Sequence, residues 1–356
     1  MDKKRNSSVE LLRIVSMMGV ILLHYNNQNM GGAFKYASGN NISMYWLYFI
    51  ESVGISAVNV FIIISSYYLC CTAKRRLGKI FELIAQLILF RQIFYIITIM
   101  MGVETLSFKG FASNLLPTDY FVVLYSVLYI VSPYINVCIN NLSRKNLRLL
   151  ICICFLIFSV WNIIVDAIEN ILGHTMLGLS TIGMEGTLHG YSIVNFILLY
   201  LIGAYIRMWG VKAGNKKMIL SLLFMTLLSW FLSIWENVMK FEKHVVWNYE
   251  NPLVILSSVC IFVIFLRLKF SSSVINKLAK ASFICYLVHE PLLGMLHIEN
   301  FINNNLFVII LHQIMSVIVL YAISYLIYII YDKLSKEVWK KLNNKIDEKV
   351  LFYTES

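Results

Sequence analysis

The first apolar stretch of the chain carries three ionisable side chains, Glu10, Arg13 and His24. At about 100° per residue, the eleven-residue spacing places Arg13 and His24 on one face of a helix, about 16 Å apart along its axis. Glu10 precedes Arg13 by three residues, a spacing that allows an ion pair. Arginine binds anionic groups, and histidine acts as a general base or as a nucleophile. This spacing therefore predicts a polar path with anion binding at one end and acid–base or nucleophilic chemistry at the other.

The same three residues also have an interpretation without chemistry. Glu10 and Arg13 could extend to the headgroups at one membrane surface, and His24 could mark the opposite boundary. Charged side chains inside a span cost about 2.5–3.5 kcal/mol each on insertion scales, which favours a functional reason for them. Composition and spacing alone leave both interpretations open.

The elements that position these residues are expected to be transmembrane helices. Of the 356 residues, 59% are hydrophobic and 14% are charged, whereas soluble domains are roughly 45–50% apolar and about 25% charged. The apolar runs do not alternate with period two, and only helices and closed barrels can span lipid. We therefore expect an all-α, polytopic bundle of about ten helices. The expected spans are residues 9–25, 44–70, 80–101, 119–140, 147–165, 190–209, 217–235, 252–268, 281–296 and 305–331.

The positive charges give this bundle a direction. If the N-terminus is cytoplasmic, 24 of the 30 Lys and Arg residues fall on the inner side, 4 fall on the outer side, and 2 lie within spans. Cytoplasmic loops of membrane proteins carry such an excess, so we expect both termini inside. The net charge of +11 then reflects topology, and no nucleic-acid partner is expected. In this orientation Arg13 lies toward the cytoplasm and His24 toward the outer face.

One membrane domain is expected over residues 1–332, followed by a short, basic, amphipathic cytoplasmic tail over residues 333–356. The seven cysteines lie within spans or at their edges. They are expected to be small packing residues, and neither a disulfide framework nor a metal site is predicted.

Six segments, in order along the chain, resemble the acyltransferase-3 family of multi-pass membrane O-acyltransferases. The first helix of that family has an arginine, ten further residues and then a histidine, as at Arg13 and His24. Ser66 stands where the family usually has a glycine. The other similar segments are residues 59–69, the basic loop 74–79, and residues 125–136, 199–207 and 282–289.

This resemblance implies an enzyme that moves an acyl group, usually acetyl, from cytoplasmic acyl-CoA to a carbohydrate hydroxyl at the outer face of a bacterial plasma membrane. It implies that His24 is catalytic, either as a general base or as an acylated intermediate, with Glu10 and Arg13 assisting. The residues expected to bind acetyl-CoA, as a co-substrate, are Arg13, Arg75, Arg76 and Lys79. The residues expected to contact the substrate are Ser65, Tyr67 and His289.

Several of these assignments have alternatives. Arg75 and Arg76 could serve only as topology signals, and His289 could be an interfacial or capping residue. The other histidines, His189 among them, have no partner at helical spacing and are not expected to take part. Tryptophans such as Trp247 are expected at the membrane boundary, with stacking on sugars as the alternative. A membrane transporter or flippase of glycan precursors is the alternative function, although no internal repeat supports it.

Overall fold

The computed structural model describes residues 6–37, 39, 41–72, 75–184, 186–241 and 244–349, and within these ranges it contains no strand. Helices account for 77% of the residues that the structure describes. The α-helices are α1 (Ser7–Asn26), α2 (Ala33–Tyr36), α3 (Ile42–Gly54), α4 (Ala57–Leu69), α5 (Gly78–Met100), α6 (Phe108–Asn114), α7 (Tyr120–Asn140), α8 (Arg144–Phe155), α9 (Trp161–Leu172), α10 (Ile193–Trp209), α11 (Asn215–Val238), α12 (Pro252–Leu266), α13 (Ser273–Leu278), α14 (Ser282–Leu293) and α15 (Leu306–Lys349). The short helices are the π-helix η1 (Leu156–Val160) and the 3-10 turns η2 (Leu188–Gly190), η3 (Val245–Trp247), η4 (Ala279–Ala281) and η5 (Ile298–Asn300).

Eight helical segments in the described ranges are long and apolar enough to cross a membrane. They are α1, α3 with α4, α5, α7, α8 with η1 and α9, α11, η3 with α12, and α15. The two remaining expected spans, residues 190–209 and 281–296, correspond to the shorter helices α10, of 17 residues, and α14, of 12 residues. The all-helical, multi-pass architecture is confirmed, whereas the count of ten crossings stays a prediction.

Two expected spans differ in detail from the structure. The span expected at residues 44–70 is divided at Ile55 and Ser56 into α3 and α4, although the two helices together form one candidate crossing. The span expected at residues 147–165 extends from Arg144 to Leu172, and the π-helix η1 lies in its middle. Neither interruption was predicted from the sequence, although Gly54 stands directly before the first one.

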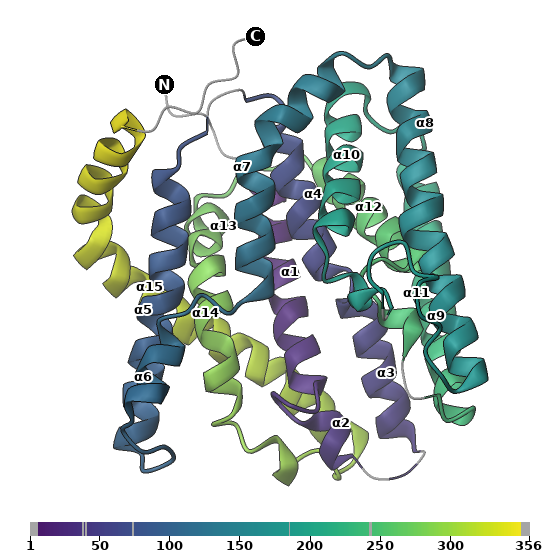
Figure 1. Ribbon diagram of the computed structural model, residues 1–356. Helices are drawn as coiled ribbons and strands as arrows, with labels where there is room; N and C mark the ends of the chain where they lie inside the picture. The colour runs from purple at the N-terminus through teal and green to yellow at the C-terminus, as the bar shows by residue number, and fades with distance from the viewer. Residues whose placement is uncertain are drawn as a thin grey trace.

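The start of α1 and the end of α15 lie at the same end of the bundle (Figure 1). The Ser7 hydroxyl accepts a hydrogen bond from the Ser272 amide, at 2.9 Å, and Arg76 forms an ion pair with Asp347, at 2.7 Å. The expected tail, as far as residue 349, continues the last helix rather than starting a new one. Because the first helix begins and the last helix ends at the same end of the bundle, the structure is consistent with an even number of crossings. That this end is cytoplasmic stays a prediction. Lys3, Lys4, Arg5, Lys74, Lys243 and the tail beyond residue 349 lie outside the described residues.

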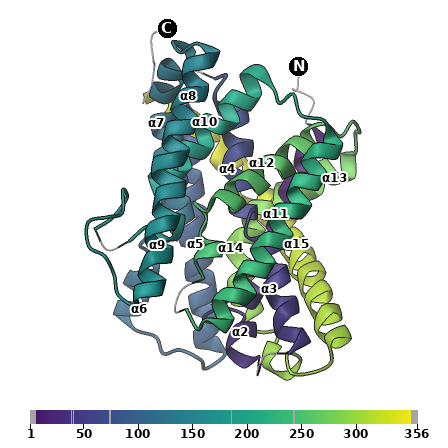
Figure 2. The same cartoon turned by 90° about the vertical axis from the view of Figure 1, so that its right-hand side faces the viewer.

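Helix α1 lies in the middle of the bundle and packs against α3, α4, α12, α13, α14 and α15 (Figure 1). Helices α8 and α9 form one side of the molecule and α15 forms the opposite side (Figure 1, Figure 2). Asn6 begins α1 by accepting a hydrogen bond from the Ser8 amide, as preferred N-cap residues do. The helix that carries the ionisable residues is therefore surrounded by protein.

Helices α4 and α10 approach each other closely at Ser66 and Gly203. A Cβ atom on Gly203 would overlap the Ser66 hydroxyl and lie 2.9 Å from the Ile63 carbonyl oxygen. The glycine that permits this close contact is therefore Gly203 on α10. It lies opposite Ser66, the position on α4 where the sequence comparison above expected a glycine. This contact fixes α4 in the core, beside α1.

Candidate active site

Two histidines from opposite ends of the sequence form a pair within the bundle. His24, near the end of α1, and His289, on α14, are joined by a hydrogen bond of 2.6 Å between His24 Nδ1 and His289 Nε2. Their rings are stacked, with centroids 4.6 Å apart. His289 is only 2% exposed. Helices α1 and α14 pack directly against each other, which holds this pair in place.

The partners of His289 determine where the protons of the pair lie. His289 Nδ1 is 2.7 Å from the Tyr286 carbonyl oxygen and 3.1 Å from that of Cys285. A carbonyl oxygen can only accept, so Nδ1 of His289 carries the proton, and in the neutral ring Nε2 has the lone pair. His24 must then donate its Nδ1–H to His289. The lone pair of neutral His24 therefore lies on Nε2, which is the atom available to act as a base or a nucleophile.

Both histidines line a cavity of about 420 Å³, named here the His24 cavity. Its wall combines aromatic rings, such as Trp247 and Tyr191, with acids, such as Glu51. Asn26 donates a hydrogen bond of 2.9 Å to Glu51 Oε2. Aromatic side chains together with convergent polar groups are features of small-molecule binding sites. Trp247 lies in the wall of this cavity. Stacking on a sugar, the alternative to a membrane-boundary role, requires such a position.

Arg13 lines a second cavity, of about 300 Å³, named here the Arg13 cavity. Met17 and Val20 line it as well. The positions 13, 17, 20 and 24 follow the helical spacing of one face, so the two cavities are arranged along a single stripe of α1. Arg13 Nη1 donates to Glu10 Oε1 at 2.8 Å, as the three-residue spacing predicted. Glu10 itself is buried.

The structure places the other expected anion-binding residues in different settings. Arg75 is 5% exposed, and its guanidinium donates to Ser132 and to the Leu69 and Thr72 carbonyls. Arg76 is exposed and bonded to Asp347, and Lys79 is exposed. Lys280, one of the 24 basic residues expected on the inner side, lines the Arg13 cavity.

The expected substrate contacts also separate. Ser65 lines the Arg13 cavity and His289 lines the His24 cavity. Tyr67 instead accepts a hydrogen bond from Arg207 on α10, at 3.2 Å, and its ring lies under that guanidinium. Of these three residues, Ser65 and His289 are the two that the structure places in the cavities described here.

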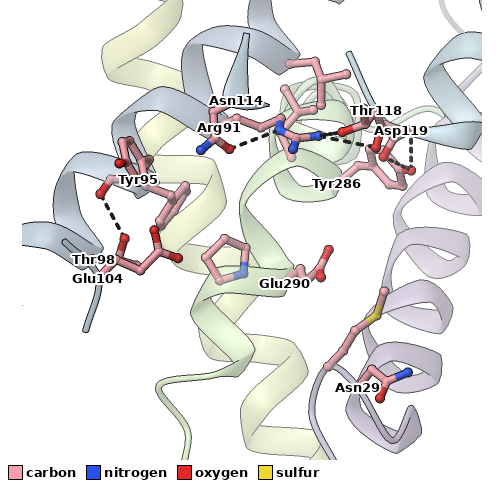
Figure 3. A pocket seen from close by; sticks show the side chains of 15 residues that line it. Asn29, Arg91, Tyr95, Thr98, Glu104, Asn114, Thr118, Asp119, Tyr286 and Glu290 are labelled. Carbon is pink, nitrogen blue, oxygen red and sulfur yellow. Dashed lines mark hydrogen bonds between the residues drawn. The ribbon is translucent and has the colours of Figure 1, made fainter. Parts of the chain in front are cut away.

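Tyr286 stands where the cavities meet. It lines the His24 cavity, the Arg13 cavity and a third cavity of about 600 Å³, named here the Arg91 cavity. Its hydroxyl donates to both carboxylate oxygens of Asp119, at 2.8 and 2.9 Å. Figure 3 shows this contact beside Arg91, whose guanidinium reaches Thr118. Glu290 lies in the same view and lines both the Arg91 and the His24 cavities.

Asp119, Tyr286 and His189 also line the His24 cavity, although none of them was expected from the sequence to be a site residue. Tyr286 precedes His289 by three residues on one helix, and this spacing was a usable signal. Asp119 is the N-cap of α7, so in sequence it has the pattern of an ordinary capping residue. His189 interacts with Asn248, 59 positions away, which helical spacing could not reveal.

A family model described as an acyltransferase domain matches residues 6–331 of the chain. The match includes every residue that lines the three cavities. No curated protein and no solved structure matches the chain.

Proposed function

The chain belongs to the acyltransferase-3 family and is an acyltransferase, and from this premise we propose which groups it transfers. The donor is acyl-CoA, with acetyl-CoA as the expected form, bound from the cytoplasmic side. The acceptor is a hydroxyl of a cell-surface or lipid-linked carbohydrate on the outer side of the plasma membrane. The observation that carries the proposal is the His24–His289 pair, whose hydrogen bonds leave the lone pair of His24 on Nε2 in a cavity wall.

The donor side of the proposal rests on the Arg13 cavity. Its walls are largely apolar and carry two cations, Arg13 and Lys280. Lys280 also lines a neighbouring cavity of about 280 Å³, together with Lys336 and Lys340 of α15. Acyl-CoA combines phosphates with a long, mostly neutral arm that ends in the thioester. We assign the phosphates to the lysine-lined end and the arm to the apolar walls, with the thioester directed toward Tyr286 and His24.

The acceptor side rests on the His24 cavity. Aromatic rings such as Trp247 and Tyr249 offer faces for the apolar side of a sugar ring. Carboxyl and amide groups such as Glu51 and Asn27 offer partners for hydroxyls. This combination suits a carbohydrate better than an apolar acceptor. The carboxyl and amide groups can pair with sugar hydroxyls, whereas an apolar acceptor would bury them without partners, which is costly.

In the direct route, His24 acts as a general base. Nε2 takes the proton of the acceptor hydroxyl as its oxygen attacks the thioester carbonyl carbon. The carbon–sulfur bond breaks, and the departing thiolate takes the proton back from His24, giving an ester and free CoA. Because His24 Nδ1–H donates to neutral His289, the imidazolium formed in between is stabilised by this hydrogen bond.

In the two-step route, Nε2 attacks the thioester carbonyl carbon, the carbon–sulfur bond breaks, and CoA leaves as the thiolate. The acceptor hydroxyl then attacks the acyl-imidazolium, Nε2 is released, and the hydroxyl proton neutralises the thiolate. Both routes use the same nitrogen, so the geometry serves either. Rapid quenching in denaturant at neutral pH, after mixing with labelled acetyl-CoA in the absence of acceptor, separates them. Label bound to the wild-type protein and absent from His24→Ala establishes the two-step route. No bound label on a preparation that forms ester once acceptor is added establishes the direct route.

The test of the function uses the purified protein in lipid nanodiscs with labelled acetyl-CoA and a mixture of bacterial surface glycans. We expect label in an alkali-sensitive ester on the glycan, with release of one CoA per ester formed. Replacement of His24 by Ala should lower the rate at least about 100-fold, the usual contribution of general acid–base catalysis. Transfer at the wild-type rate by His24→Ala would overturn the mechanism.

A further inference from the structure

A third histidine of the His24 cavity, His189, is held by buried polar groups that the proposed reaction does not use. His189 Nδ1 is 2.9 Å from Asn248 Oδ1. Asn248 Nδ2 donates to Asp166 Oδ2 at 2.7 Å, and the Thr187 hydroxyl donates to the same oxygen at 2.8 Å. Asp166, Thr187 and Asn248 are 5%, 3% and 2% exposed. A buried network of this kind costs stability unless it is fully satisfied, so it holds His189 in a defined orientation.

The polarity of the network runs in one direction. The Asp166 carboxylate accepts, so it turns the amide NH₂ of Asn248 toward itself and the amide oxygen toward His189. That oxygen also only accepts, so His189 Nδ1 carries the proton. In the neutral ring the lone pair of His189 is therefore on Nε2. His189 lines the cavity, and Nε2 is the ring nitrogen left for a ligand.

The backbone around His189 is also unusual. Leu188 and His189 have φ of 56° and 52°, and Gly190 follows at 80°. Successive left-handed residues with side chains are unfavourable, and such strain persists only where the surrounding structure imposes it. Here the Tyr249 amide donates to the His189 carbonyl at 3.0 Å. A Cβ on Gly190 would overlap the Glu250 carboxylate, so the close packing of this turn against residues 248–250 directs His189 to the cavity.

We propose that His189 binds the acceptor: its Nε2 accepts a hydrogen bond from a second hydroxyl of the carbohydrate and so determines which hydroxyl faces His24. This inference rests on the proposed function and adds a specificity-determining residue to it. His189 makes no bond to the reacting atoms in this role. It orients the sugar from η2, across the cavity wall from the catalytic pair on α1 and α14.

The decisive variants are His189→Asn and His189→Gln. An Asn amide can reproduce the Nδ1–H donor to Asn248 but offers nothing at the position of Nε2, and asparagine tolerates the left-handed backbone. A Gln amide can extend its oxygen to the position of Nε2. We expect His189→Asn to raise the acceptor KM about three- to tenfold with the acetyl-CoA KM unchanged, and His189→Gln to recover part of this loss. His174→Ala, in the same connecting segment but not among the residues that line the His24 cavity, is the matched control and should behave as wild type.

A second readout separates this inference from the proposed function. Each variant is assayed with the surface glycan and with methanol, which has a single hydroxyl and cannot use His189 as a second contact. We expect His189→Asn to be impaired with the glycan only, and NMR of the product to show ester on additional hydroxyls. An unchanged acceptor KM with an unchanged product would overturn the role of His189 and leave the transferase standing. A wild-type protein that acylates neither acceptor would overturn the proposed function and this inference with it.

Discussion

Replacing His289 by Leu tests whether the histidine pair sets the protonation state of His24. Leucine fills a similar volume on α14 but accepts no hydrogen bond, so His24 Nδ1–H loses its partner at 2.6 Å. A hydrogen bond to a charged group contributes about 1.5–3 kcal/mol, and the imidazolium formed during transfer would lose this amount. At about 1.36 kcal/mol per factor of ten in rate, kcat should fall about 10- to 160-fold.

The assay is ester formation from labelled acetyl-CoA at saturating glycan, with thermal unfolding of each purified variant measured in parallel. The acetyl-CoA KM should change little, because His289 is not among the residues that line the Arg13 cavity. His289→Gln is the matched control, since its amide oxygen can replace Nε2 as the acceptor, and it should recover a large part of kcat. A folded His289→Leu protein with the wild-type kcat would refute the reasoning, as would equal losses in the Leu and Gln variants.

Three further predictions concern other parts of the site. Lys280→Ala should raise the acetyl-CoA KM about tenfold, because a charge-assisted phosphate contact is lost; the exposed Lys277→Ala is its control, and equal KM values in titrations of CoA release would contradict the assignment. Tyr286→Ala should increase CoA release without ester formation, because removing the ring that lines the His24, Arg13 and Arg91 cavities admits water to the thioester. Tyr286→Phe should keep CoA release and ester formation coupled, and a constant ratio of CoA to ester in both variants would exclude this role. Gly203→Val should lower the free energy of unfolding by about 1–3 kcal/mol through overpacking against α4; an unchanged thermal midpoint would contradict the close approach.

The sequence predicted α1 and its stripe because everything needed lies within one helix. The spacings of Glu10, Arg13 and His24 are local, and helical geometry converts them directly into a face. The ion pair of Glu10 with Arg13 is confirmed. The all-helical class followed from composition for the same reason, since a bilayer accepts few other solutions.

What the sequence could not predict depends on contacts between distant segments. His289 lies 265 positions from His24, so only the packing of α14 against α1 reveals the pair. Arg75 has the same local pattern as a free basic loop residue, yet its guanidinium is bonded to Ser132 of α7. His189 was set aside because its partner is not at helical spacing, although the network through Asn248 is tertiary. In each case the sequence identified the side chain, but only the tertiary structure identified its partner.

The central position of α1 has a consequence for how substrates enter. Helices α3, α4, α12, α13, α14 and α15 all pack against α1. It therefore cannot shift without repacking most of the core, and a close-packed interior resists such changes. Helix α5 is different, because only 22% of its most apolar stretch is buried within the protein. It also forms one wall of the Arg91 cavity, at the edge of the bundle. Opening of the Arg91 cavity to lipid-borne molecules should therefore cost less through movement of α5 than of α1, and hydrogen exchange should be faster in α5 than in α1.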